Sequence, residues 1–160
     1  MTFECMPLCS PAAADSTKTQ AIAALEQLYH TSDGPSINFL LDLLPKPTTR
    51  VWMLVDENSF CVAAAWYATV ADEAELLDIR VKESHQGTGL GRELLTQTLD
   101  ALRDEGTAQV FLEVRRSNLV AQNLYRSLSF SEIGERTNYY PSREGREDAI
   151  LMALDLSVTW

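Results

Sequence analysis

A glycine-rich turn at residues 83–92, Glu-Ser-His-Gln-Gly-Thr-Gly-Leu-Gly-Arg, has the composition of a binding site for an anion. The apolar run at residues 75–81 predicts a strand before the turn, and the leucine spacing after it predicts a helix that ends near Gly106. The first N–H groups of a helix have no partner within the helix, and the helix dipole favours negative charge beside them. Glycines let a phosphate approach that backbone closely. The turn therefore predicts a phosphate-bearing ligand.

The spacing of the glycines separates this turn from two common phosphate-binding motifs. The order G-x-G-x-G differs from the dinucleotide-binding fingerprint, and no acidic residue ends a following strand at the required distance. No Gly-Lys-Ser or Gly-Lys-Thr closes the turn as it would in a P-loop. An ordinary glycine-rich loop is the alternative, and the position between a strand and a helix favours phosphate binding over it.

A carboxylate, Glu113, interrupts the apolar residues 110–114, which predict a central strand. Alternation along a strand places Glu113 on the same face as Phe111. A charged side chain at the end of a central strand is costly unless it is hydrated or used, and strand ends are where ligand clefts open. The residues alone leave two interpretations open: a functional carboxylate, or a rim carboxylate paired with Arg115 or Arg116.

Asn118 and Tyr125 lie seven residues apart in a segment that predicts a helix, with Ser117 or Asn118 as its cap. Two helical turns separate them, so they share one face. If Asn118 caps the helix beside a cleft, Tyr125 lies further along the same side. A tyrosine at core spacing more often packs than catalyses, and the spacing alone does not decide between these roles.

Strands and helices must alternate in a mixed sheet to position these residues. The N-terminus predicts a short edge strand, and residues 141–146 are predicted as the loop of a final hairpin. The other predicted elements are helices at residues 17–30 and 37–44 and strands at residues 51–55, 60–70, 130–140 and 148–154. Without repeats or linkers, we expect one domain over residues 1–160. Its class is α/β (α+β), with helices on both faces of the sheet.

Composition narrows the functional class. The chain has 160 residues, of which 46% are hydrophobic, and a formal net charge of -10, which argues against a nucleic-acid binder. No apolar stretch is long enough for a transmembrane helix and no secretory signal is present, so we expect a cytoplasmic protein that does not enter a membrane. The three cysteines, Cys5, Cys9 and Cys61, lack the spacing of a disulfide framework or a zinc site, so no metal is expected.

Charge is distributed unevenly over this acidic chain. The basic residues expected around the anion site are Arg80, Lys82, Arg92, Arg115 and Arg116. A locally basic pocket on an acidic body would suit an anionic cofactor beside a cationic partner. The plainer alternative is that the acidic charge only keeps the protein soluble.

Taken together, these motifs resemble those of a known superfamily. The residues Gln86-x-x-Gly89-x-Gly91-Arg92 after a strand resemble the acetyl-CoA pyrophosphate loop of the GNAT acetyltransferases. Residues 112–118, with Ala121, Tyr125 and Phe130, resemble the rest of that core, and residues 138–152 resemble its RimI-type branch of ribosomal-protein-alanine N-acetyltransferases. The combination, over roughly residues 73–155, is more specific than any single motif.

The resemblance implies a GNAT-like mixed, mostly antiparallel central sheet flanked by helices, and acetyl-CoA as cosubstrate. It implies Glu113 as general base, Tyr125 as general acid, and Tyr139 and Tyr140 as the lining of the acceptor groove. The implied cofactor-binding residues are Ile79, Arg80, Val81, Gly87, Thr88, Gly89, Leu90, Gly91, Arg92 and Asn118. Residues 31–36 lack the Pro-Trp-Ser sequence that is common in this branch.

The implied reaction is direct attack of a protein N-terminal amine on the thioester. Such an amine has a pKa of about 7.7–8.0, so a carboxylate needs only to assist its deprotonation near neutral pH. The implied acceptor is the N-terminal alanine of a basic ribosomal protein, number eighteen of the small subunit. Two alternatives stay open: a lysine side chain or small-molecule amine as acceptor, and a non-catalytic acyl-CoA-binding module. The oligomeric state is not determined by the sequence.

Overall fold

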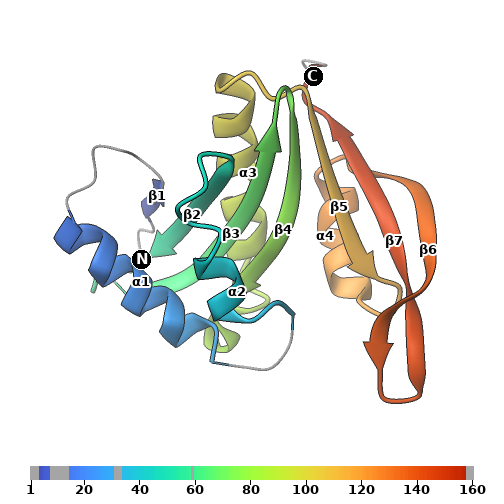
Figure 1. Ribbon diagram of the computed structural model, residues 1–160, viewed down its shortest axis with the longest axis horizontal. Coiled ribbons are helices and arrows are strands. Elements are labelled where there is room, and N and C mark those ends of the chain that lie inside the picture. Colours follow the sequence, from blue (N-terminus) through green and yellow to red (C-terminus); the bar gives the residue numbers. More distant parts are fainter. Residues whose placement is uncertain (1–3, 8–14, 31–33, 59, 158–160) are drawn as a thin grey trace.

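The computed structural model describes residues 4–7, 15–30, 34–58 and 60–157, in which one sheet of seven strands runs in the order β1-β2-β3-β4-β5-β7-β6 (Figure 1). Every neighbouring pair is antiparallel except β4 with β5. The predicted mixed, mostly antiparallel fold class is therefore confirmed. The strands are β1 (Glu4–Pro7), β2 (Thr49–Val55), β3 (Cys61–Val70), β4 (Glu73–Val81), β5 (Gln109–Arg115), β6 (Ser131–Ser142) and β7 (Gly145–Asp155).

Helices cover both faces of the sheet, as the sequence predicts (Figure 1). One face packs against α3 (Leu90–Asp104) and α4 (Leu119–Ser127), and leucines of α3 such as Leu94 and Leu102 are fully buried there. The other face packs against α1 (Asp15–Leu28) and α2 (Ile37–Leu41), where Leu25 and Trp66 are fully buried. None of the helices in these described segments is long and apolar enough to cross a membrane.

The parallel strands β4 and β5 separate part of the way along their length. Their pairing runs from Glu73 opposite Gln109 to Leu76 opposite Leu112 and stops there. A bulge follows in β4, because Leu76 pairs with Tyr67 of β3 and Asp78 pairs with Trp66, which leaves an extra residue between them. Figure 1 shows the two strands meeting at one end and spreading apart toward the other.

The C-terminal hairpin differs from the prediction in its length. Residues 141–146 are not a loop, because Pro141 pairs with Arg146, and Arg143 and Glu144 alone form the turn. Proline is tolerated here because β6 is an edge strand, where a missing N–H does not break the sheet. The helix predicted at residues 37–44 is also shorter, since α2 ends at Leu41.

A wide bulge in β6 determines where its tyrosines lie. Arg136 pairs with Ala149 and Tyr140 pairs with Glu147, so three residues of β6 stand opposite one residue of β7. Asn138, inside the bulge, has a φ of 51°, and its backbone N–H donates to the Asp148 carboxylate over 2.9 Å. Asparagine tolerates this left-handed conformation better than most residues. The bulge thereby interrupts the alternation of side chains just before Tyr139 and Tyr140.

Candidate active site

The space between the separating ends of β4 and β5 is a cleft of about 1270 Å³. This volume exceeds the roughly 300–1,000 Å³ that is typical of pockets for small ligands, so the cleft can hold a larger cofactor. Its walls come from the end of β4, the end of α1, the junction of β5 with α4 and the tip of the β6–β7 hairpin. Among the predicted cofactor-binding residues, the lining includes Ile79, Arg80, Val81 and Asn118.

The glycine-rich turn lies at the rim of this cleft. Gln86 lines the cleft and donates a hydrogen bond from its side-chain amide to the Val81 carbonyl over 3.1 Å, which joins the turn to the end of β4. Gly87 and Gly89 have φ values of 73° and 92°, in the left-handed region that favours glycine. Gly89 is the N-cap of α3 and has no side chain to bind the first N–H groups. The predicted pyrophosphate-binding residues Gly87, Thr88, Gly89, Leu90, Gly91 and Arg92 span this turn and the start of α3.

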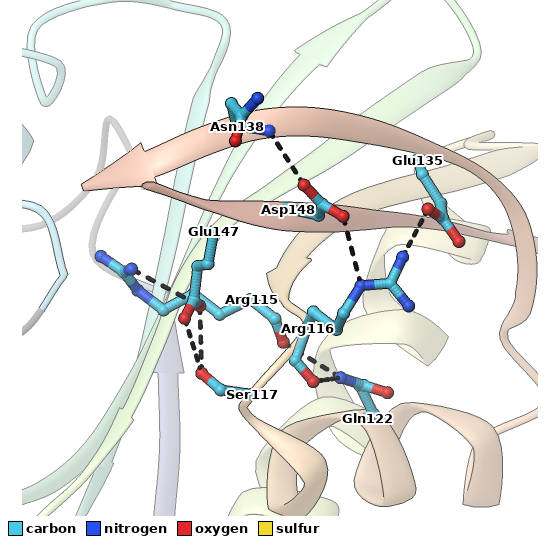
Figure 2. Close-up of polar contacts among 8 residues, drawn as sticks. All are labelled: Arg115, Arg116, Ser117, Gln122, Glu135, Asn138, Glu147 and Asp148. Atoms are coloured by element: carbon cyan, nitrogen blue, oxygen red, sulfur yellow. Dashed lines mark hydrogen bonds and ion pairs between the residues drawn. The ribbon is translucent and has the colours of Figure 1, made fainter. Parts of the chain in front are cut away.

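Ion pairs join the end of β5 to the β6–β7 hairpin (Figure 2). Arg116 contacts Glu135 and also Asp148, whose carboxylate lies 3.4 Å from the guanidinium. Arg115 lies 3.5 Å from the Glu147 carboxylate, which also accepts a hydrogen bond from Ser117. Of these two arginines, Arg115 lines the cleft, whereas Arg116 pairs with carboxylates of the hairpin and is not among the residues that line it.

The predicted cap of α4 is Asn118. Its side-chain oxygen accepts a hydrogen bond from the Ala121 N–H over 3.1 Å. The buried Gln122 fixes the preceding bend, because its side-chain amide donates to the carbonyls of Arg115 and Arg116 (Figure 2). These contacts hold Asn118 at the wall of the cleft.

Tyr125 is buried in α4, with 6% of its surface exposed, and its ring packs against Phe130 at 5.8 Å between centroids. Burial raises the pKa of its phenol, the charge of Asp78 raises it further, and the nearby phenol of Tyr140 adds to the effect when it ionises. The hydroxyl therefore lies near side chains of β4 and β6. Within the residues that the structure describes, this hydroxyl has no hydrogen-bond partner.

Glu113 lies on the face of the sheet opposite α3 and α4, as alternation predicts, because Val110, Leu112 and Val114 are the buried residues of β5. Its carboxylate forms an ion pair with Arg136 over 2.8 Å, and 16% of its side chain is exposed. The partner is therefore neither Arg115 nor Arg116, the pairing that the plainer interpretation expected. Glu113 lines a second hollow of about 340 Å³, separate from the cleft and formed where the start of β4 pairs with β5, with β6 and β7 at its side.

Tyr139 and Tyr140 of β6 lie near Glu113, and Tyr140 also lies near Tyr125. The rings of Tyr139 and Tyr140 meet edge to face at 5.0 Å. A hydrogen bond to Glu113 and the charge of that carboxylate raise the pKa of Tyr139. Burial raises the pKa of Tyr140 to about 12, and Glu113 adds to the effect. Tyr140 also lies under the Arg115 guanidinium, 4.5 Å from the ring centroid. The structure thus groups Glu113 with Tyr139, and Tyr125 with Tyr140.

A second carboxylate, Asp78, lines the main cleft and was not singled out from the sequence. Tyr29, which follows α1, donates a hydrogen bond to it over 2.7 Å. Burial raises the pKa of Asp78, while the hydrogen bond from Tyr29 and the charge of Arg80 lower it. The sequence does contain a signal for Asp78, because this acidic residue interrupts an apolar strand just as Glu113 does.

Comparisons with known proteins agree with this architecture. Residues 19–130 match the model of the Acetyltransferase (GNAT) family. A ribosomal protein bS18-alanine N-acetyltransferase from Escherichia coli strain K12 is 48% identical over 102 residues, which cover 64% of this chain and 69% of that protein.

Solved structures agree as well. The crystal structure of the ribosomal-protein-S18-alanine N-acetyltransferase from Escherichia coli matches with a TM-score of 0.78 and 35% identity, over 98% of this chain and 97% of that one. The structure of Arabidopsis thaliana NAA60 in complex with acetyl-CoA matches with a TM-score of 0.77 over 98% of this chain and 100% of that one. At 16% identity, this second match shows a likeness of fold alone.

Proposed function

This chain belongs to the acetyltransferase (GNAT) family, and we propose that it transfers the acetyl group of acetyl-CoA to the N-terminal amine of a protein. The cleft between β4 and β5 is the observation that carries the proposal. A cofactor-sized space opens where two parallel strands separate, and the uncapped start of α3 lies at its rim. One wall therefore suits an extended chain and the rim suits a diphosphate, and CoA contains both.

The binding of acetyl-CoA is proposed as follows. In the described residues, pairing of β4 with β5 ends at Leu76, so the backbone of Ile79, Arg80 and Val81 faces the cleft on that side. Unpaired strand groups of this kind can bind the amides of a pantetheine arm. The N–H groups of residues 87–92 would hold the pyrophosphate, and Asn118 would contact the cofactor from the opposite wall.

The proposed chemistry is direct transfer without a covalent enzyme intermediate. The acceptor nitrogen forms a bond to the carbonyl carbon, and the bond between that carbon and sulfur breaks. Glu113 receives the proton that leaves the nitrogen, directly or through water, and releases it to solvent. Tyr125 gives a proton to the departing sulfur and regains one from solvent. Its raised pKa keeps the phenol protonated at neutral pH, which is the form in which a general acid donates.

The proposed acceptor is the N-terminal alanine of a ribosomal protein. The similar Escherichia coli proteins are named for the alanine of ribosomal protein bS18, and we carry this acceptor to the chain by relationship. The net charge of -10 supports a basic acceptor, because complementary charge speeds encounter. Tyr139 and Tyr140 would line the path of the peptide.

Two peptides of equal length and charge test the acceptor class. One begins with alanine, has a free N-terminal amine and contains arginine but no lysine. The other has a blocked N-terminus and one lysine. We expect release of free CoA from acetyl-CoA with the first peptide. Faster release with the second would favour a side-chain amine as acceptor. Binding of acetyl-CoA without release with either peptide would favour the non-catalytic module.

A further inference from the structure

We propose that Asp78 binds the protonated amine of the acceptor, so that two carboxylates, Asp78 on β4 and Glu113 on β5, flank the point of acetyl transfer. This inference rests on the proposed function and gives the two carboxylates different roles. Asp78 would orient the ammonium group before reaction, and Glu113 would receive the proton.

The first support is the position of Asp78 at the separation of the strands. Pairing of β4 with β5 ends at Leu76, and Asp78 is the second residue after Leu76. The bulge between these two residues turns the Asp78 side chain to the face of the sheet that α1 covers. Asp78 lines the main cleft together with Ile79 and Asn118. A ligand that occupies this cleft therefore meets the carboxylate.

The second support is the hydrogen bonding of this carboxylate. Tyr29 donates to its Oδ2 over 2.7 Å, and the described residues supply no second hydrogen-bond donor to it. An ionised carboxylate has about four acceptor positions on its two oxygens. Its Oδ1 lies 3.3 Å from the place that a Cβ on Gly34 would occupy, so no side chain of Gly34 fills the space beside this oxygen, and Arg80 Nη2 lies 3.0 Å from the same place.

The third support is that a neutral phenol leaves the charge of Asp78 in place. A partly buried carboxylate is costly unless a cation compensates it, and an ammonium group would provide that compensation together with strong hydrogen bonds. Arg136 is in direct contact with Glu113, 2.8 Å from its carboxylate, whereas Arg80 acts on Asp78 through its charge, with no ion pair between Arg80 and Asp78 among the described residues. Asp78 is therefore the better binding group for a cationic acceptor.

The fourth support is the electrostatic influence of Asp78 on the proposed acid. The charge of Asp78 raises the pKa of the Tyr125 hydroxyl, which lies across the cleft region on α4. An amine held by Asp78 would lie close to a thioester whose sulfur contacts Tyr125, which is the arrangement that direct attack requires.

Steady-state kinetics of Asp78→Asn with the alanine peptide test this proposal. The substitution keeps the shape and the acceptor for Tyr29 but removes the charge. We expect the KM for the peptide to rise roughly 10- to 100-fold, as for the loss of a charged hydrogen bond, with a much smaller change in kcat and in the KM for acetyl-CoA. Tyr29→Phe is the matched control, because it removes the same hydrogen bond and keeps the charge. Its peptide KM should change far less.

The outcomes separate this inference from the proposed function. If the wild-type protein releases no CoA with the alanine peptide, the proposed function itself fails. If the wild type is active and Asp78→Asn has an unchanged peptide KM, or changes no more than Tyr29→Phe, only the role of Asp78 is overturned. Should Asp78→Asn misfold and lose acetyl-CoA binding, the Asp78→Asn, Tyr29→Phe double variant is compared with Tyr29→Phe alone. This gives the same test, because both proteins lack the hydrogen bond of Tyr29 and differ only in the charge at position 78.

Discussion

The ends of β4 and β5 carry one carboxylate each, and their surroundings are opposite. Asp78 lies under α1 and is held by a neutral phenol, Tyr29. Glu113 lies on a stretch of sheet beside the hollow and is held by a cation, Arg136, from the edge strand β6. The same sequence signal, an acidic residue in an apolar strand, thus produces a carboxylate that bonds a phenol, with the charge of Arg80 acting on it, in one place and a carboxylate in direct contact with an arginine in the other.

The difference follows from what covers each half of the sheet. The helices α1 and α2 pack on β2, β3 and β4, so the partner of Asp78 on β4 is Tyr29, a buried residue directly after α1. On the same face, β5 takes its partners from the β6–β7 hairpin, where Tyr139 follows Asn138 in the bulge and bonds Glu113. A covered carboxylate suits recognition of a cation, and an accessible one suits proton exchange with solvent.

Removal of the Tyr125 hydroxyl should have the largest effect on turnover, because transfer to an amine held by Asp78 and deprotonated by Glu113 still needs a proton for the departing sulfur. We expect Tyr125→Phe to lower kcat roughly 10²- to 10⁴-fold while the affinity for acetyl-CoA is unchanged. Stopped assays for free CoA and calorimetric binding measure the two quantities. Tyr67→Phe is the control, because Tyr67 is buried in the same core and bonds Thr98 over 2.8 Å, away from the cleft. It should lose about 1 kcal/mol of stability and no activity. A Tyr125→Phe enzyme with normal kcat would exclude the acid role.

Neutralisation of Glu113 should act on turnover rather than on binding. We expect Glu113→Gln to lower kcat by roughly 10² or more, because no base receives the amine proton, with a smaller change in the peptide KM. Glu105→Gln is the matched control: Glu105 also pairs with an arginine, Arg50, over 2.8 Å but lies at the end of α3. Equal losses in both variants would mean that the loss of an ion pair, rather than of a base, explains the effect.

Strain in the glycine turn should lower cofactor affinity without changing the chemistry. Gly89→Ala forces a side chain into the left-handed region at a cost of about 1–2 kcal/mol, and we expect weaker acetyl-CoA binding. Gly106→Ala imposes the same strain, at a φ of 97°, beyond the other end of α3. Titration with acetyl-CoA should show a loss of affinity in the first variant alone. A similar loss in both would assign the effect to general destabilisation.

The face covered by α1 should also protect the thiol of Cys61. Burial raises the pKa of this thiol to about 12, so little thiolate forms in the folded protein at mildly alkaline pH. Because the unfolded value is about 8.5, the thiol contributes stability that is present below that pH and is lost as the pH rises toward the folded value. In a variant with Cys5→Ser and Cys9→Ser, we expect no reaction with a thiol reagent until urea unfolds the chain, and full activity before that. Rapid reaction of the folded variant would contradict a closed face.

The sequence predicts the helices and strands better than the polar partners of the site residues. Predictions for β3, β4, β5 and α3 agree with the structure within a few residues, because apolar periodicity depends on which face is buried. The resemblance to the GNAT family, drawn from residues 86–92 and 112–118, is confirmed. The roles assigned to Glu113 and Tyr125 stay predictions.

Long-range pairing explains what the sequence could not provide. The partner of Glu113 comes from 23 residues further along the chain, and that of Asp78 from 49 residues before it. Neither separation follows any local period, so Arg115 and Arg116 were the natural but wrong choices for Glu113. The register of β6 depends on the bulge at Asn138, and no turn motif in the sequence indicates that bulge. No recognisable motif includes Asp78 either.

A crystal structure of the protein with CoA and a peptide that begins with alanine is the most direct test of where the cofactor and the acceptor amine bind. We predict that the pantetheine arm lies along Ile79, Arg80 and Val81, with the sulfur within hydrogen-bond distance of the Tyr125 hydroxyl. The N-terminal nitrogen of the peptide should lie between Asp78 and Glu113. A CoA thiol outside the cleft between β4 and β5, or a peptide nitrogen remote from both carboxylates, would contradict the account.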